Sequence, residues 1–263
     1  MELKKVTLVY FSATDTTRKT LRAIARGMGA PVEEVDFTLP GDRVEPHAFG
    51  PDDFILFGAP VYGGLMPLFE REYLQKITGK NTPCAVVGVY GNREFEDALV
   101  EMEDLVSANG FAVIGGGAFI GEHSFSSEIA GGRPDENDLA VAENFGKKLA
   151  EKVAAMTEIA PLPQGILPGN RPYKERGGAG APMTPETNDD CVNCKLCARK
   201  CPMGAIDLED VHKVDPDKCI HCLRCVRVCP KKAKAFTSEA FKGTVAWCLA
   251  NFAEPRKEPV TFL

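Results

Sequence analysis

The chain has 263 residues, of which 44% are hydrophobic and 26% charged, and its formal net charge is −6. This composition is ordinary for a globular protein of one large or two smaller domains, and its acidic balance argues against general nucleic-acid binding. No apolar run reaches the length of a membrane span or a secretory signal, so we expect a cytoplasmic protein without membrane insertion. Ten cysteines would be unusual there as structural disulfides, which favours metal or redox chemistry.

Residues 1–158 alternate strand and helix signals and form the first expected domain. Leu21, Ile24 and Met28 fall at helical spacing, which gives the first helix an apolar stripe. Strands that are apolar throughout and separated by helices predict a parallel sheet covered on both faces. The expected strands are Val6–Phe11, Val32–Phe37, Phe54–Gly58, Ala85–Tyr90 and Ala112–Phe119. The expected helices are Thr17–Met28, Pro67–Lys76, Phe95–Asn109 and Asp135–Met156.

The rest of the chain divides by composition into three segments. Residues 159–187 are crowded with proline and glycine, which is typical of a connector. Because a free loop of that length is unusual, we expect the connector to lie along a domain surface. Residues 188–240 form the second expected domain and contain eight of the ten cysteines. Residues 241–263 include the single tryptophan, Trp247, and are expected to dock on one of the two domains as a C-terminal extension.

The strongest signal is a repeated cysteine motif, C-x2-C-x2-C-x3-C-P, whose second copy begins 28 residues after the first. Three closely spaced thiolates can hold one face of an iron–sulfur cubane, whereas the fourth cysteine of the run binds the other cluster. One predicted [4Fe–4S] cluster is therefore held by Cys191, Cys194, Cys197 and Cys229. The other is held by Cys219, Cys222, Cys225 and Cys201. The alternatives are a zinc ribbon or a disulfide scaffold. Zinc sites usually show two separated C-x2-C pairs, and the motif instead resembles that of bacterial two-cluster ferredoxins.

Charge is unevenly distributed along the chain. Residues 188–235 contain ten Lys or Arg and seven Asp or Glu, so the remainder carries a net charge of −9. The basic surplus can stabilise anionic clusters, form a solvated face or dock an acidic redox partner, and the sequence leaves these interpretations open.

The first expected strand leads into small hydroxyl residues, in the stretch FSATDTTRK. Hydroxyl and free N–H groups at a helix N-terminus bind anions. Asp15 lies in the middle of this loop, where its carboxylate either opposes a phosphate or caps the helix. The stretch resembles the Ser/Thr-x-Thr-Gly-x-Thr phosphate loop of flavodoxins, in which Ser12, Thr14 and Thr17 match and Asp15 replaces glycine.

Two further loops follow the third and fourth expected strands, at the carboxyl ends where open α/β sheets bind ligands. They are GAPVYGGLMP, residues 58–67, and VYGNREFEDAL, residues 89–99. Each places a tyrosine, Tyr62 or Tyr90, beside glycines that let a flat ring approach the backbone. Flavodoxins use the corresponding loops to hold the isoalloxazine ring of FMN.

These loops, together with FIGEHSFSSEIAGGRPD and the paired cysteine motifs, resemble the flavodoxin–ferredoxin fusion proteins of anaerobic bacteria and archaea over nearly the whole chain. The resemblance implies an α/β flavodoxin-like doubly wound parallel sheet of strand order 2-1-3-4-5. A small α+β two-[4Fe–4S] ferredoxin-like domain follows it. The FMN-binding residues that the resemblance implies are Ser12, Ala13, Thr14, Asp15, Thr16, Thr17, Pro60, Val61, Tyr62, Gly63, Gly64, Tyr90, Gly91, Asn92 and Arg93.

The function implied is electron transfer between FMN, two [4Fe–4S] clusters and an external redox partner protein in anaerobic metabolism. The alternative is a flavin-dependent reductase of a small organic or thiol substrate, fed by its own clusters, with Arg93 or His123 as proton donor. A regulatory redox sensor is disfavoured because no segment resembles an output domain. The donor, the acceptor and the choice between monomer and homodimer stay open.

Overall fold

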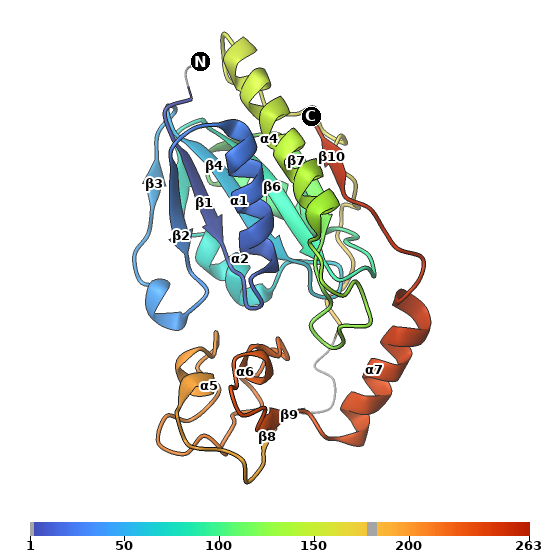
Figure 1. The fold of residues 1–263 in the computed structure, drawn as a ribbon. Coiled ribbons are helices and arrows are strands. Elements are labelled where there is room, and N and C mark those ends of the chain that lie inside the picture. The colour runs from blue at the N-terminus through green and yellow to red at the C-terminus, as the bar shows by residue number, and fades with distance from the viewer. Residues whose placement is uncertain (1–2, 178–182) are drawn as a thin grey trace.

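The computed structural model describes residues 3–177 and 183–263, which form two lobes (Figure 1). The sheet lobe, residues 3–177 with the C-terminal strand, contains a six-stranded sheet of order β10-β7-β6-β4-β1-β2. Its strands are β1 (Val6–Tyr10), β2 (Val32–Asp36), β4 (Phe54–Pro60), β6 (Thr82–Tyr90), β7 (Phe111–Ile120) and β10 (Val260–Phe262). All pairings are parallel except that of β10 with β7. The expected flavodoxin-like order 2-1-3-4-5 is therefore confirmed, with one antiparallel edge strand added.

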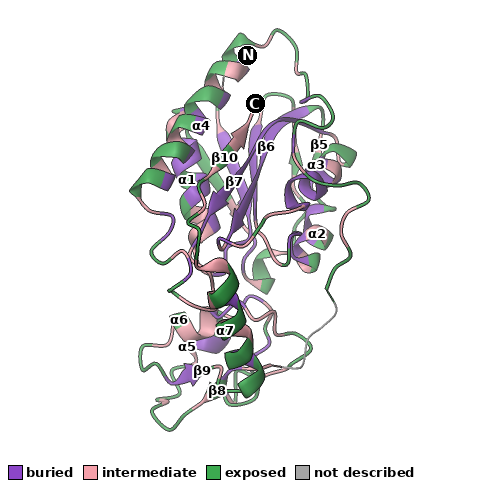
Figure 2. Cartoon of the chain, turned by 90° about the vertical axis from the view of Figure 1, so that its right-hand side faces the viewer, coloured by how far each residue is buried: buried purple, intermediate pink, exposed green. Residues whose placement is uncertain are grey.

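Helices cover both faces of this sheet (Figure 2). One face carries α1 (Thr16–Met28) and α4 (Glu136–Ala155), and the other carries α2 (Leu68–Leu74) and α3 (Ala98–Ala108). Because β1, β6 and β7 are buried along their whole length, each face has its own apolar core. Short elements at the margin are the 3-10 turn Pro40–Asp42 and the strands β3 (Ala48–Phe49) and β5 (Thr78–Gly79).

Helices α1 and α4 approach each other closely at two glycines. A Cβ added to Gly146 would lie 1.9 Å from the carbonyl oxygen of Ile24, and one added to Gly27 would lie 2.0 Å from that of Glu143. Both distances are far below contact, so only glycine allows this packing. The start of α4 is also well defined, because the Asp135 side chain accepts hydrogen bonds from the first-turn N–H groups.

The second lobe, residues 186–235, is called the cysteine lobe here. It is built from β8 (Glu186–Thr187), α5 (Leu196–Arg199), α6 (Arg224–Arg227) and β9 (Lys234–Ala235). The two short helices repeat one local structure, since each follows a residue in the left-handed region, Lys195 at φ 60° and Leu223 at φ 57°. Strands β8 and β9 pair antiparallel and close the lobe. The lobe lies against the edge at which the parallel strands end (Figure 1).

The part of the connector that precedes residue 178 lies along the surface of the sheet lobe. Leu162 donates its backbone N–H to Val113 O at 2.7 Å, and Asn170 donates its own to Asp97 Oδ1 at 2.8 Å. Arg171 then forms three hydrogen bonds with Asp104, at 2.7, 2.9 and 3.0 Å. The first contact is with β7, and the contacts of Asn170 and Arg171 lie along α3 and its N-cap.

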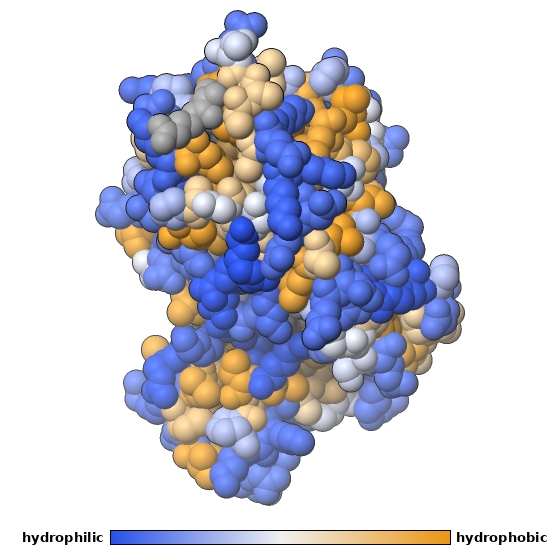
Figure 3. Space-filling model, turned by 45° about the horizontal axis from the view of Figure 1, so that its top comes forward, coloured by the Kyte–Doolittle hydropathy of each residue, from blue (hydrophilic) through white to orange (hydrophobic). Residues whose placement is uncertain are grey.

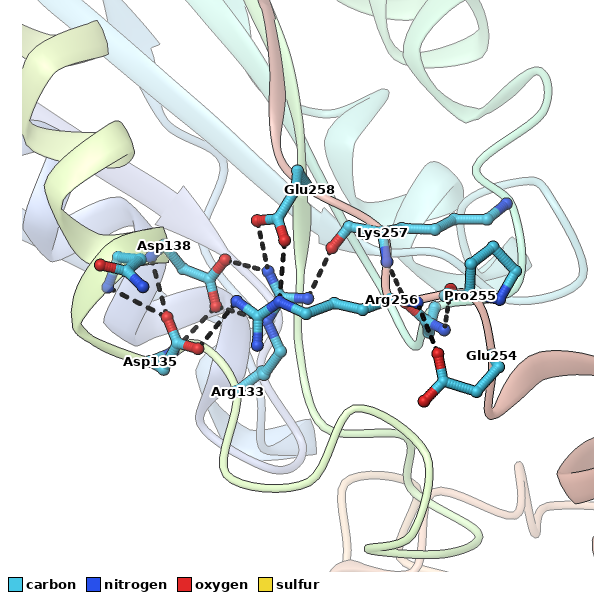
Figure 4. Close-up of polar contacts among 10 residues, drawn as sticks. Arg133, Asp135, Asp138, Glu254, Pro255, Arg256, Lys257 and Glu258 are labelled. Carbon is cyan, nitrogen blue, oxygen red and sulfur yellow. Dashed lines mark hydrogen bonds and ion pairs between the residues drawn. The ribbon is translucent and has the colours of Figure 1, made fainter.

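The C-terminal extension consists of α7 (Glu239–Phe252) and β10, and it returns to the sheet lobe. Figure 4 shows how a group of charged residues fastens it beside the start of α4. Buried Arg133 pairs with Asp138 and donates to Lys257 O at 2.6 Å, and Arg256 donates to Asp135 at 2.9 Å. Among residues 3–177 and 183–263, no helix is long and apolar enough to cross a bilayer.

Gly146→Ala is expected to lower the free energy of unfolding by about 1–3 kcal/mol, because the added methyl group forces α1 and α4 apart. Gly243→Ala is the matched control, since nothing lies within 4 Å of a Cβ built at this position of α7. The control is expected to raise the free energy of unfolding by about 0.5–1 kcal/mol. Urea denaturation measures both values, and equal effects would contradict the close packing of the two helices.

Candidate flavin and iron–sulfur site

A pocket of about 870 Å³ lies where the loops after β1, β4, β6 and β7 meet the cysteine lobe and α7. This volume is in the range of cofactor and ligand sites. The sequence-predicted residues that line it are Ala13, Thr14, Thr16, Thr17, Pro60, Val61, Tyr62, Gly63, Tyr90, Gly91 and Arg93. His123 and Ser124, from the loop after β7, line it as well. The pocket thus draws on three separate loops that the sequence placed at one edge of the sheet.

The loop between β1 and α1 offers several free hydrogen-bond donors. Ser12 fastens it, because its Oγ accepts from Arg18 N at 3.2 Å and its own N–H donates to Thr38 Oγ1 at 2.9 Å. Within the described part of the chain, the backbone N–H groups of residues 13–17 have no acceptor. Thr17 Oγ1 is buried and likewise has no partner among those residues. Orphaned donors at the start of a helix fit a phosphate.

Asp15 occupies the position of the glycine in the flavodoxin phosphate-loop pattern, and its backbone has a conformation that glycine favours. Its φ is 66° and its ψ is −2°, in the left-handed region. The alternative that the Asp15 side chain caps α1 is wrong, because that side chain makes no cap hydrogen bond. The carboxylate instead pairs with Arg18 at 3.0 Å and is 45% exposed. This arrangement weakens its repulsion of a phosphate.

Four sequence-predicted residues do not line the pocket: Ser12, Asp15, Gly64 and Asn92. Gly64 has a φ of 90°, and a Cβ there would collide with the side chain of Glu96. Asn92 faces the C-terminal extension, where its Nδ2 donates to Phe252 O at 2.7 Å and its Oδ1 accepts from Lys257 N at 2.9 Å. Asn92 therefore holds the extension in place beside the pocket.

Helix α7 contributes a wall of the pocket that the sequence did not reveal. Trp247 and Phe252 line it, and their rings meet edge to face with centroids 5.0 Å apart. Arg93, opposite them, has its guanidinium 6.0 Å from the Phe252 ring. Trp247 remains 57% exposed, so this wall stands between the pocket and solvent. In the sequence, the single tryptophan of the C-terminal extension was the one feature that could have indicated this wall.

The eight motif cysteines surround two small cavities in the cysteine lobe. The near cavity is lined by Cys201, Cys219, Cys222 and Cys225. The far cavity is lined by Cys191, Cys194, Cys197 and Cys229. This division is the same as that of the two predicted ligand sets, including the exchange of the fourth cysteines. No three His, Cys, Asp or Glu side chains of the described residues converge closely enough to ligate a single metal ion.

The surroundings of these sulfurs suit metal-bound thiolates. Burial raises the pKa of Cys222 to about 11 and that of Cys225 to about 12, so these thiols need a metal to ionise at neutral pH. Burial also acts on Cys229, but neighbouring N–H groups outweigh it and lower the pKa. Ala233 N lies 3.2 Å from that sulfur, and Ala205 N lies 3.3 Å from Cys201 Sγ. Such donors stabilise anionic sulfur.

A buried cation lines the far cavity. Lys234 is 2% exposed, and its Nζ donates to Val211 O at 2.6 Å. Burial raises the pKa of the Cys197 thiol, and the charge of Lys234 opposes this rise. Part of the basic surplus of the cysteine lobe thus stabilises negative charge at the motif cysteines.

The pocket and the near cavity share a wall. Met203 and Ile220 line both of them, and His221 lines the pocket. These residues follow the motif cysteines directly, Met203 two positions after Cys201 and Ile220 one position after Cys219. Among the described residues, the far cavity shares no lining residue with the pocket or with the near cavity, and its Cys194 is exposed.

Arginine side chains join the two lobes. Arg43 donates to Thr38 O at 2.6 Å within the sheet lobe and to Pro202 O at 2.7 Å in the cysteine lobe. Arg227 pairs with Glu122 at 2.8 Å and donates to His123 O at 3.2 Å. Hydrophilic residues predominate along the waist between the lobes on the face drawn in Figure 3. On that face the rim of the interface is thus polar, and Met203 and Ile220 form the wall shared by the pocket and the near cavity.

Comparison with known proteins identifies a 4Fe-4S dicluster domain over residues 190–233. A flavodoxin from the domain Archaea is 21% identical and matches 57% of this chain and 99% of its own, with a TM-score of 0.40. Flavodoxin 2 from Bacillus cereus is 18% identical and matches 56% of this chain and 99% of its own, with a TM-score of 0.41. No match was found among curated proteins.

Rubredoxin oxygen:oxidoreductase from the anaerobe Desulfovibrio gigas is 16% identical, with a TM-score of 0.41. The match covers 58% of this chain and only 37% of that protein. The fold assignment rests on the strand order described above, not on these scores. The chain joins a flavodoxin-like sheet to a 4Fe-4S dicluster domain, a combination that supports an FMN and iron–sulfur electron-transfer protein.

Cys201→Ala is expected to impair the cluster of the near cavity, although Cys201 belongs to the first motif. Its EPR spectrum after reduction should therefore match that of Cys222→Ala. Cys229→Ala is the matched variant of the second motif, and its spectrum should match that of Cys194→Ala. If Cys201→Ala instead resembles Cys194→Ala, the ligands do not exchange between motifs.

Proposed function

We propose that this protein transfers electrons between FMN, two [4Fe–4S] clusters and an external redox partner. The observation that carries the proposal is the wall shared by the pocket and the near cavity, formed by Met203 and Ile220. A flavin in the pocket and a cluster in the near cavity would be separated only by side chains of this kind. Cys194 of the far cavity is exposed, and a partner protein would exchange electrons with the chain on this side.

The residues present fit both groups. Bound FMN supplies one- and two-electron chemistry, and each bound cluster supplies one-electron chemistry. The free N–H groups of residues 13–17 and the hydroxyl of Thr17 would hold the phosphate. Residues 60–63 would border the ring together with Tyr90, Gly91 and Arg93. The cysteines of each cavity would hold one cluster as thiolates. The protein's own contribution is to bind these groups, shield them from water and fix the distance between them.

A reductase of a small organic or thiol substrate is the second candidate. One observation favours it, because His123 and Arg93 line the same pocket. Burial lowers the pKa of His123, with the nearby charge of Arg227 adding to the effect. The imidazole is therefore neutral at pH 7 and a poor proton donor. The reductase would be favoured if the protein turned over such a substrate without any partner protein and if His123→Gln abolished this turnover.

Cofactor content after anaerobic purification tests the proposal. We expect about one FMN, eight iron and eight sulfide per chain, the content of one flavin and two cubanes. Iron and sulfide without flavin would refute the proposed role of the sheet lobe. A single zinc or four iron per chain would refute the proposed pair of clusters.

Asp15→Gly is expected to change the Kd of FMN by less than about threefold, because an exposed carboxylate paired with Arg18 contributes little at the phosphate. Fluorescence titration of the apoprotein measures this value. Asp15→Asn is the control, since asparagine tolerates a positive φ while removing the charge. Tightening by about tenfold in both variants would mean that the carboxylate faces the phosphate.

A further inference from the structure

Arg224 of the cysteine lobe contacts the backbone of the predicted phosphate loop. It lies in α6 between Cys222 and Cys225, two residues that line the near cavity. Its Nη1 donates to Ser12 O at 3.1 Å and to Ala13 O at 2.8 Å. The Nε of the same guanidinium is buried and has no partner among the described residues. One arginine thus connects the loop after β1 with the loop that carries the near-cavity cysteines.

These two hydrogen bonds determine where the neighbouring N–H groups point. The peptide bonds after Ser12 and Ala13 are trans, so each carbonyl points away from the N–H group of the same peptide unit. With both carbonyls turned to Arg224, the N–H groups of Ala13 and Thr14 point to the opposite side of the loop. Ala13 and Thr14 line the pocket, whereas Arg224 does not. Arg224 therefore influences the pocket indirectly, by orienting the two peptide planes that carry the N–H groups of Ala13 and Thr14.

We propose that Arg224 is a positioning residue for the FMN phosphate, an inference that rests on the FMN binding proposed above. By fixing two peptide planes, it directs two backbone donors at the phosphate before the ligand arrives. Each hydrogen bond also polarises the amide that it touches, which strengthens the N–H group as a donor. The phosphate site of the sheet lobe is consequently incomplete without the cysteine lobe.

The position of Arg224 adds a consequence for assembly. Because it lies between two near-cavity cysteines, the same short segment shapes the near cavity and supports the phosphate loop. Binding of FMN and formation of the near cluster should therefore favour each other by the same factor. Arginine suits this role better than lysine, since its planar guanidinium holds a fixed geometry toward two carbonyls and always carries its charge.

Arg227 provides a matched control. It lies one turn further along α6 and also joins the lobes, through Glu122 and His123 O. Among the residues that the structure describes, it forms no hydrogen bond or ion pair with the loop after β1. Loss of either arginine loosens the docking of the lobes, but only loss of Arg224 releases the peptide planes of the phosphate loop.

The experiment compares FMN with riboflavin, which lacks the phosphate, on the full chain with its clusters assembled. Fluorescence titration gives the Kd of both ligands for the wild type, Arg224→Gln and Arg227→Gln. We expect Arg224→Gln to weaken FMN binding by about tenfold, the scale of one charge-assisted hydrogen bond, and riboflavin binding by less than about twofold. Arg227→Gln should weaken both ligands by the same factor.

Equal weakening of FMN and riboflavin in Arg224→Gln would overturn the proposal, because it would reveal a role in docking alone. Unchanged FMN binding would overturn it as well. If Arg224→Gln does not hold iron, Arg224→Lys replaces it, and there an FMN affinity within twofold of the wild type overturns the proposal. Failure of the wild type itself to bind FMN would instead refute the proposed function.

Discussion

The relative position of the two lobes depends on arginine side chains that donate to backbone carbonyls across their interface. Arg43 reaches Pro202 O from the sheet lobe, and Arg224 and Arg227 reach Ser12 O, Ala13 O and His123 O from the cysteine lobe. Because a carbonyl belongs to the main chain, each contact fixes the backbone position of a loop and not only one side chain. Between these contacts, Met203 and Ile220 are held at the wall that the pocket and near cavity share.

The loops of the sheet lobe explain why the cysteine lobe docks where it does. Parallel strands expose unpaired loops and helix N-termini at their carboxyl ends, and the phosphate loop is one of these. The cysteine lobe covers this edge with an arginine-bearing segment, and α7 covers the adjacent side with Trp247 and Phe252. The same edge therefore provides binding groups, shielding from water and contact with the near cavity.

Much of the fold was predictable because the relevant signals are local. The runs of apolar residues predicted the parallel sheet. The spacing of the cysteines predicted two sets of four, and these are the sets that line the near and the far cavity. The sequence left the role of the Asp15 carboxylate open between a helix cap and a charge facing the phosphate, because its αL backbone and its pairing with Arg18 depend on the turn as a whole. Asn92 and Arg224 act on residues that are distant in sequence, so no local pattern reveals that Asn92 holds the C-terminal extension or that Arg224 contacts the phosphate loop. The strand β10 is short and gains its order only by pairing with β7.

The central claim is that electrons pass between flavin and near cluster within one chain. Flash photoreduction of the flavin under anaerobic conditions, followed by the visible absorbance of the clusters, measures this step directly. The account predicts a first-order reduction of the clusters whose rate constant is independent of protein concentration. A rate that rises in proportion to protein concentration would mean that electrons pass between separate molecules, and it would contradict the role of the wall formed by Met203 and Ile220.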